Sequence, residues 1–252
     1  MFLYLLLIFT IISFIISFSF FKKRKKTTKK QIIFKTNSDL YDKEYVEMYD
    51  TIHYDYYRTQ KEINIILPTT SSDSIVLDIG SGTGHYVHEL QEKGVRAIGI
   101  DNSSAMVQYS TKYPHHYIHG NVLEISMFPK NSFTHATCLY YTLYYINHKE
   151  QLFYNVYHWL IPGGLFMVHL TSKCNFGKPS IKDTKYTYTR KIQENKVYET
   201  ITQGNKLRRN EHSFYMEPIQ TIVTMAQEAG FIVVSSETYD FTNFIYILKK
   251  PE

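Results

Sequence analysis

The sequence predicts an α/β fold: a doubly wound, mostly parallel sheet with helices on both faces and an antiparallel hairpin at one edge. Three observations support this fold class. Short β-branched runs alternate with amphipathic helical segments between residues 74 and 171, an order typical of parallel sheets. A glycine-rich loop connects the first of these strands to the helix after it. The last two apolar runs follow each other without an intervening helix, as the strands of a hairpin do.

The individual elements follow from apolar periodicity and from helix-stopping residues. Residues 41–67 have helical apolar spacing and no Gly or Pro, which predicts one or two helices. Further helices are expected at 85–94, 103–113, 149–161 and 218–230, and parallel strands at 74–79, 95–101, 116–121, 133–146 and 165–171. A polar insertion at 172–216 is expected to hold two short strands around a turn, and 231–240 with 241–250 to form the hairpin.

Polar and glycine residues fall together at one edge of this expected sheet. Ligands of doubly wound sheets bind outside the carboxyl ends of the strands. The glycine loop at 80–84, Asp101, Asn121 and residues 140–145 all follow strand ends. The sequence therefore predicts a binding site at this edge.

The spacing within the loop, Gly80-Ser81-Gly82-Thr83-Gly84, narrows the ligand. A phosphate-binding P-loop requires Lys followed by Ser or Thr after its second glycine, whereas His85 and Tyr86 follow here. A dinucleotide loop has a third glycine where His85 stands. A nicotinamide-dependent enzyme is therefore disfavoured and stays as an alternative.

The pattern VLDIGSGTG, followed by Asp101 at the end of AIGID, closely resembles the class I S-adenosylmethionine-dependent methyltransferases. The resemblance covers most of residues 41–252 and extends to GNV at 120–122, LIPGG at 160–164 and EAGF at 228–231. It is closest to the small-molecule subgroup, of type 11/25, and implies a Rossmann-like sheet with S-adenosyl-L-methionine as cofactor.

The resemblance also implies roles for residues at the strand ends. Asp101 is expected to bind the ribose diol, and Asp78 to orient the loop or contact the methionine amino group. Asn121 stands where the family often has Asp, and Thr134 where it often has a carboxylate. The expected cofactor-binding residues are Asp78, Gly80, Ser81, Gly82, Gly84, Asp101, Asn102, Asn121, Val122 and Tyr140.

The candidate catalytic residues are His169, Tyr144 and His212, with Tyr140, Tyr141, Tyr145 and Glu211 in the same two regions. A histidine that closes a strand is also a common core residue, as are buried tyrosines, so both readings stay open. Tyr54 and Tyr57 are expected to form a lid by analogy with similar enzymes. The expected reaction is methyl transfer to a small-molecule, lipid or protein acceptor. The alternative is a module that binds the cofactor without catalysis.

Metal and nucleic-acid partners are not expected. Cys138 and Cys174 form no CxxC pair, and His115, His116 and His119 have no Cys or carboxylate at ligand spacing. The net charge of +5 arises from seven basic residues within 22–30. The remaining chain has 21 basic against 23 acidic side chains, a net charge of −2, which does not suit a polyphosphate backbone. The oligomeric state is left open.

The first thirty residues predict a retained membrane anchor. Phe2 to Phe21 is uncharged and, as a helix, would match the thickness of a bilayer core. A cleaved signal peptide is disfavoured, because the basic cluster follows the apolar run and bulky residues occupy its end. The basic residues would stay on the cytoplasmic side. The expected organisation is an anchor at 1–21, a basic juxtamembrane linker at 22–40 and a cytosolic methyltransferase domain at 41–252.

Overall fold

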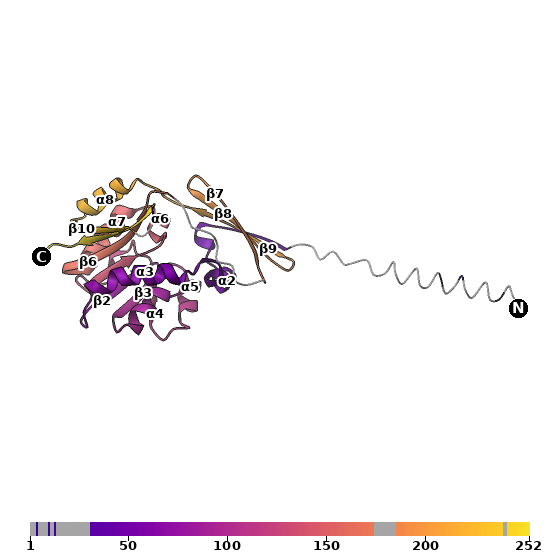
Figure 1. Cartoon of the computed structure of the whole chain (residues 1–252), viewed down its shortest axis with the longest axis horizontal. Coiled ribbons are helices and arrows are strands. Elements are labelled where there is room, and N and C mark those ends of the chain that lie inside the picture. The colour runs from indigo at the N-terminus through magenta and orange to yellow at the C-terminus, as the bar shows by residue number, and fades with distance from the viewer. Residues whose placement is uncertain (1–3, 5–9, 11–12, 14–30, 174–184, 239–240) are drawn as a thin grey trace.

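The computed structural model describes residues 4, 10, 13, 31–173, 185–238 and 241–252. The predicted anchor at 2–21 and the basic residues at 22–30 lie outside the described residues, apart from three single positions. Within the described part of the chain, no helix combines the length and apolar character needed to cross a bilayer. The described residues form two sheets with helices around the larger one (Figure 1).

The larger sheet has seven strands in the order β10-β11-β6-β5-β2-β3-β4. Strands β2 to β6 are parallel to one another, while β11 is antiparallel to both β6 and β10. The predicted parallel sheet with a terminal hairpin is therefore confirmed. The strands are β2 (Ile75–Ile79), β3 (Arg96–Asp101), β4 (His116–His119), β5 (Phe133–Cys138), β6 (Leu160–Thr171), β10 (Ile232–Thr238) and β11 (Asn243–Lys249).

Helices cover both faces of this sheet, as doubly wound folds require. The predicted segment 41–67 forms two helices, and a short helix, α6, lies within the expected strand region 133–146. The helices are α2 (Lys43–His53), α3 (Tyr56–Ile66), α4 (His85–Glu92), α5 (Ser104–Ser110), α6 (Thr142–Tyr145), α7 (Lys149–Trp159) and α8 (Ile219–Glu228), with single turns η1 (Asn37–Asp39), η2 (Leu67–Thr69) and η3 (Ile125–Met127).

The core lies in two layers that follow the alternation of the strands. Leu77 packs with α7 and α8 on one face, while the preceding Val76 packs with α3 and α4 on the other. Successive side chains of a strand point to opposite faces, and because both faces are covered, Ile75, Val76 and Leu77 are apolar without polar alternation before Asp78. This double burial fixes the carboxyl end of β2, and with it the glycine loop.

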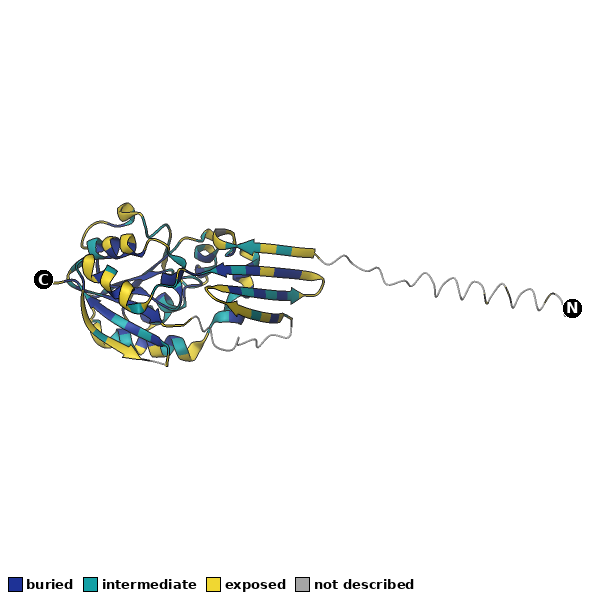
Figure 2. Cartoon of the chain, turned by 90° about the horizontal axis from the view of Figure 1, so that it is seen from above, coloured by how far each residue is buried: buried dark blue, intermediate teal, exposed yellow. Residues whose placement is uncertain are grey.

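A second sheet of four strands has the order β1-β9-β8-β7. Its strands are β1 (Gln31–Thr36), β7 (Thr187–Gln193), β8 (Lys196–Gln203) and β9 (Lys206–Ser213). In Figure 1, β7, β8 and β9 lie on the opposite side of the domain from β10. Viewed from above, β8 carries buried bands that alternate with bands of intermediate exposure (Figure 2). The buried face of the second sheet packs on α2 through a cluster that includes Tyr45, Ile52 and Ile201.

Three predictions of where strands begin or how many there are were wrong in detail. The linker prediction fails for residues 31–36, because β1 pairs in parallel with β9. The insertion at 172–216 contains a third strand, β9, besides the two expected ones. Strand β6 begins at Leu160 and not at residue 165, because the Pro162–Gly164 turn is accommodated at an irregularity of the β5–β6 pairing.

Helix α2 connects the two sheets. Asp42 caps its first turn by accepting the N–H of Tyr45 at 3.0 Å. Near its other end, Asp50 accepts the hydroxyl of Thr83 at 2.5 Å and forms ion pairs with His85 and Lys112. These contacts hold α2 above the glycine loop, so that the second sheet faces the carboxyl edge of the first.

Candidate active site

The glycine loop after β2 turns sharply against β3. The backbone N–H of Gly80 donates to the carbonyl of Ile100 at 2.8 Å. Gly80 has a φ of 68°, and a Cβ atom there would lie 2.3 Å from Cγ2 of Thr142. Only glycine combines this conformation with so close an approach of α6. The loop backbone is thus exposed to the space above the strand ends.

Asp101 ends β3 beside this loop. Its Oδ2 accepts the N–H of Gly82 at 2.9 Å, and its Oδ1 accepts the N–H of Ser103 at 2.8 Å. Burial raises the pKa of this carboxyl above its ordinary value, an effect that the two backbone N–H groups oppose. Each oxygen keeps a second acceptor position, so the carboxylate can bind a pair of hydroxyl groups.

A cavity of about 430 Å³ lies between the sheet edge and the second sheet. Its floor includes most of the residues predicted to bind the cofactor: Gly80, Gly82, Asp101, Asn102, Asn121, Val122 and Tyr140. Its other walls come from before and within α2, from α6 and from the second sheet, through Tyr41, Tyr49, His53, Tyr145, Glu199 and His212. The structure thus brings the predicted cofactor-binding residues together at the floor. The sequence did not predict that α2, α6 and the second sheet would together form the other walls.

A smaller cavity of about 80 Å³ contains Asp78 and Ser81 and shares Gly80, Gly82 and Tyr140 with the larger one. The hydroxyl of Thr137 donates to Oδ1 of Asp78 at 2.7 Å, whereas Oδ2 is buried and has no hydrogen-bond partner among the residues that the structure describes. Burial raises the pKa of this carboxyl to about 7. An unpartnered buried carboxylate oxygen is costly, and an ammonium group would satisfy it.

Arg58 is a site residue that the sequence analysis missed. Its guanidinium lies 3.7 Å from the centre of the Tyr140 ring, and it lines the smaller cavity together with Asp78 and Asp50. This cavity therefore offers carboxylates and one guanidinium, the two kinds of group that an amino-acid moiety requires. Nothing distinguishes Arg58 in the sequence from other basic residues of an amphipathic helix.

Gly84 lines neither cavity. It precedes α4, with the hydroxyl group of Tyr117 and the side chain of Ser110 close to its Cα. The structure therefore gives Gly84 a packing role and not the predicted cofactor contact.

Two of the three candidate catalytic residues lie outside both cavities. His169 is fully buried, with Nδ1 against the carbonyl of Tyr140 and Nε2 3.0 Å from Oδ1 of Asn243. Tyr144 is also buried, and its hydroxyl accepts the N–H of Thr171 at 2.7 Å. Both side chains hold the end of β6 in place, so their assignment as catalytic residues is corrected to a structural one.

The third candidate, His212, lines the larger cavity, as do Tyr140, Tyr141 and Tyr145. Glu211 does not; it pairs with Lys196 at 2.5 Å. Of the expected lid residues, Tyr54 lines the smaller cavity and stacks on His85, whereas Tyr57 is exposed and lines neither.

Glu199 on β8 is the second group that sequence reasoning missed. It is 1% exposed and lines the larger cavity between two imidazoles. Nε2 of His53 lies 3.1 Å from its Oε1, and Nε2 of His212 lies 2.9 Å from its Oε2. Burial alone would raise the pKa of Glu199, but the two histidines outweigh it and hold the pKa well below its usual range. These residues meet only through the pairing of the second sheet with α2.

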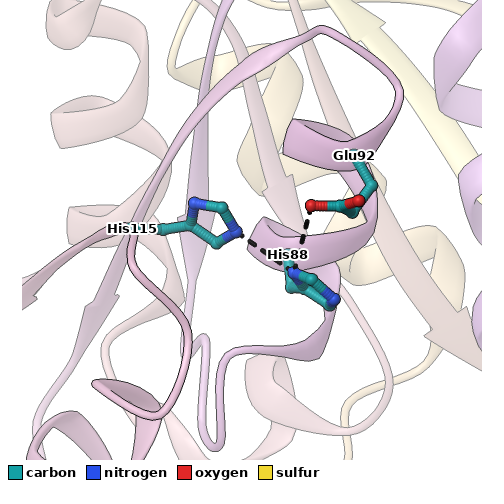
Figure 3. Close-up of side chains that lie close together, drawn as sticks. All are labelled: His88, Glu92 and His115. Carbon is teal, nitrogen blue, oxygen red and sulfur yellow. Dashed lines mark hydrogen bonds and ion pairs between the residues drawn. The ribbon is translucent and has the colours of Figure 1, made fainter.

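A separate cluster on α4 comprises His88, Glu92 and His115 (Figure 3). Nδ1 of His88 lies 3.1 Å from Nε2 of His115 and 3.9 Å from a carboxylate oxygen of Glu92. Sequence spacing does not predict this grouping, because His88 and Glu92 lie on α4, whereas His115 lies in the loop before β4 and meets them only in the folded chain. The cluster lines neither cavity.

The residues of the two cavities fit S-adenosyl-L-methionine. Among the described residues, Oδ2 of Asp78 lacks a donor that the amino group would supply, and Arg58 lines the same cavity with a guanidinium that can bind a carboxylate. Asp101 offers acceptors for a ribose diol beside a loop whose backbone is bare of side chains at Gly80 and Gly82. Two carboxylates beside the loop suit a cationic sulfonium cofactor better than a pyrophosphate.

Comparison with known proteins agrees with this fit. Residues 77–168 match a family model described as a methyltransferase domain. No curated protein sequence matches the chain. Similar solved structures include the CcbJ methyltransferase from Streptomyces caelestis, at 14% identity and a TM-score of 0.67, covering 84% of this chain and 98% of that one.

Two further structures share the fold. An S-adenosylmethionine-dependent methyltransferase from Clostridium acetobutylicum is 17% identical, with a TM-score of 0.61 and coverage of 83% and 98%. The sugar N-methyltransferase KedS8 from a Streptoalloteichus species is 12% identical, with a TM-score of 0.62 and coverage of 82% and 93%. At these identities the likenesses establish the fold alone. The methyltransferase-domain match over residues 77–168, on this fold, supports a methyltransferase that depends on S-adenosyl-L-methionine.

Proposed function

We propose that the chain methylates a small molecule that binds in the larger cavity beside the cofactor. The observation that carries the proposal is the composition of that one cavity. Its floor holds the cofactor-binding residues Gly80, Gly82 and Asp101, and its opposite wall holds ionisable side chains of α2 and the second sheet. A cofactor face and a polar acceptor face within one space are what methyl transfer requires.

Each part of the site has a distinct task in this proposal. Asp101 binds the ribose hydroxyls, while Asp78 and Arg58 hold the amino and carboxylate groups of the methionine moiety. When bound, S-adenosyl-L-methionine supplies an electrophilic methyl group on a sulfonium centre. Tyr41, Tyr49 and Tyr145 cover the cavity with aromatic rings, which excludes water and strengthens polar interactions inside.

A small molecule suits this cavity better than a lipid or a protein side chain. The second sheet and α2 form its outer walls, which favours an acceptor small enough to fit between them and the cofactor. KedS8, a sugar N-methyltransferase, provides one example of a small acceptor on the same fold.

Calorimetry and an acceptor screen test the proposal with the full-length chain. S-adenosyl-L-homocysteine is expected to bind with one site per chain, and methyl transfer is expected within a panel of small acceptors. Thermal stabilisation by NAD but not by S-adenosyl-L-homocysteine would support a nicotinamide enzyme. Cofactor binding without transfer to any small, lipid or protein acceptor would support a binding module.

We also propose that residues 2–21 anchor the chain in a membrane with the methyltransferase domain in the cytosol. The support is sequence alone: an uncharged apolar run followed at once by seven basic residues. The full-length chain should remain in the membrane fraction after alkaline carbonate washing, whereas a chain without residues 1–30 should not. Recovery of the full-length chain in the supernatant would contradict the anchor.

A further inference from the structure

Glu199 organises a buried network between the second sheet and α2. Besides the two imidazoles, its carboxylate accepts the hydroxyls of Tyr45 at 2.5 Å and Tyr188 at 2.6 Å, and the amide of Asn210 at 3.1 Å. Three hydrogen-bond donors and two imidazole nitrogens at ion-pair distance surround one buried anion whose pKa lies well below the ordinary value. The carboxylate is therefore ionised and fixed in position.

This anion determines the tautomer of His212. An ionised carboxylate can only accept hydrogen bonds, so the proton of the neutral His212 ring is assigned to Nε2, which lies 2.9 Å from Oε2 of Glu199 as an ion-pair contact and not as an aligned hydrogen bond. In a neutral ring the other nitrogen, Nδ1, is then an acceptor. Nδ1 lies 2.6 Å from the hydroxyl oxygen of Tyr145, so Tyr145 donates to it.

The result is a chain of three groups that ends in the cavity. Tyr145, His212 and Glu199 all line the cavity, and His212 lies between the other two along the chain of contacts. A hydroxyl that donates to an imidazole, which in turn donates to a carboxylate, is the arrangement that activates a hydroxyl for proton transfer. Burial raises the pKa of the Tyr145 hydroxyl well above its usual value, so Tyr145 does not itself store a negative charge.

Other ionisable groups face this chain from each neighbouring element. They are Tyr41 before α2, Tyr45, Tyr49 and His53 on α2, Tyr140 before α6, and Tyr188 and Arg190 on β7. His53 occupies Oε1 of Glu199 and leaves Oε2 to His212 and its neighbours. His53 and Glu199 are therefore positioning residues.

The presence of a base limits the class of acceptor. A neutral amine attacks a methyl sulfonium with its own lone pair, whereas a hydroxyl is a weak nucleophile until its proton is removed. The rings of Tyr41, Tyr49 and Tyr140 line the same space, and aromatic walls suit a flat aromatic acceptor. A phenolic hydroxyl meets both conditions.

We infer that the Tyr145–His212–Glu199 chain removes the proton from a phenolic hydroxyl of the acceptor; the inference rests on the proposed methyl transfer in this cavity. The acceptor proton passes to the oxygen of Tyr145 while the proton of Tyr145 passes to Nδ1 of His212. The acceptor oxygen forms a bond to the methyl carbon as the S–CH₃ bond breaks, and the electron pair of that bond stays on sulfur. Glu199 stabilises the imidazolium that results.

The tautomer can be measured in the full-length chain without cofactor or acceptor. Nitrogen-15 spectra of labelled histidine should show His212 protonated at Nε2 with an acceptor Nδ1 above neutral pH. The signal is assigned with His212→Asn. Protonation at Nδ1, or an imidazolium that persists through the pH range of activity, would overturn the inference.

Kinetics with phenols of graded acidity test the step itself. 4-Nitrophenol ionises near neutral pH without help, whereas 4-methoxyphenol does not. His212→Asn and Tyr145→Phe should each lower kcat for 4-methoxyphenol by about 100-fold or more and affect 4-nitrophenol much less. His115→Asn, a histidine outside both cavities, is the matched control and should leave both rates unchanged.

Calorimetry with S-adenosyl-L-homocysteine distinguishes failure of the proton-transfer inference from failure of the proposed methyl transfer. Unchanged affinity in the variants, with the selective loss above, supports the inference. Equal loss for both phenols, or methylation of benzylamine and of no phenol, overturns it and leaves the proposed methyl transfer standing. Normal cofactor binding without transfer to any phenol also overturns it. Absence of cofactor binding in the unmodified chain contradicts the proposed function itself.

Discussion

The backbone N–H of Gly82 donates to Oδ2 of Asp101 at 2.9 Å, which joins the glycine loop to the end of β3. Asp101 therefore shapes the loop as well as offering acceptors to the ribose. We predict that Asp101→Ala weakens binding of S-adenosyl-L-homocysteine at least about 100-fold, because two hydrogen bonds to a charged acceptor are each worth roughly 1.5 to 3 kcal/mol. Isothermal titration calorimetry measures the change.

Asp101→Asn is the matched variant for this prediction. Its amide oxygen can still accept one N–H group, so its unfolding midpoint should stay closer to that of the unmodified chain than the midpoint of Asp101→Ala. The affinity of Asp101→Asn for S-adenosyl-L-homocysteine should lie between that of Asp101→Ala and that of the unmodified chain. Unchanged affinity in Asp101→Ala would place the cofactor elsewhere.

Asp78 should make cofactor binding depend on pH. Its folded-state pKa is about 7, raised from 3.8 mainly by burial. An ammonium group at its unpartnered Oδ2 favours the ionised form, so binding releases a proton wherever the free site holds one. Affinity for S-adenosyl-L-homocysteine should therefore increase as pH rises toward 7, by up to about tenfold per pH unit, and level off above it.

The same carboxyl has a defined effect on stability. A raised pKa means that the folded state retains its proton longer than the unfolded state, so the Asp78 contribution is fully present below about pH 4 and is lost as pH rises through 7. Asp78→Asn should remove this pH dependence and flatten the binding profile. Calorimetry in buffers of different ionisation enthalpy measures the released proton; no release at pH 6 would contradict the assignment.

Gly84 and Gly94 allow backbone strain and crowding to be separated. Both have positive φ, 88° and 82°, but a Cβ at Gly84 would lie 2.7 Å from the Tyr117 hydroxyl, whereas nothing lies within 4 Å at Gly94. Gly94→Ala should cost about 1 kcal/mol of unfolding free energy from strain alone, and Gly84→Ala about 2 to 3 kcal/mol because crowding adds to it.

Denaturant unfolding of the two variants checks this difference. Neither glycine lines a cavity, so the variants should keep their affinity for S-adenosyl-L-homocysteine at temperatures where they remain folded. A selective loss of affinity in Gly84→Ala would restore the cofactor contact that the sequence had suggested. Equal stability of the two variants would show that the contact with Tyr117 relaxes freely.

The larger sheet was predictable because its strands are buried on both faces and its helices are amphipathic, so local patterns report directly on burial. The second sheet was not. Strand β9, with the sequence KLRRNEHS, reads as a polar loop. Arg208 is nevertheless buried, since it forms an ion pair with Asp42 at 2.9 Å and donates to the carbonyl of Leu40 at 2.7 Å. Partners more than 160 residues away leave no local signal.

The same distinction separates the two halves of the site. The cofactor residues follow strand ends in a fixed order, so their position in the sequence predicted their convergence. Glu199 and His53 acquire meaning only when β8 meets α2, and His169 is satisfied by Asn243 on a strand 74 residues away. A histidine at a strand end cannot be assigned as catalytic or structural until that partner is known.

Strand β1 sets where the N-terminus of a folded fragment can begin. Residues 31–36 pair with 206–211 on β9, and Leu40 is buried against α2. A fragment of residues 31–252 keeps this pairing, whereas a fragment of residues 41–252 exposes the edge of β9 and removes Leu40 and Asn37 from the wall of the larger cavity.

We predict that the 31–252 fragment unfolds at the same temperature as the full-length domain and binds S-adenosyl-L-homocysteine equally well. The 41–252 fragment should unfold several degrees lower, bind more weakly, and self-associate through the exposed edge. Thermal unfolding, calorimetry and light scattering measure these properties; identical behaviour of the two fragments would mean that β1 is dispensable and that the second sheet is held by α2 alone.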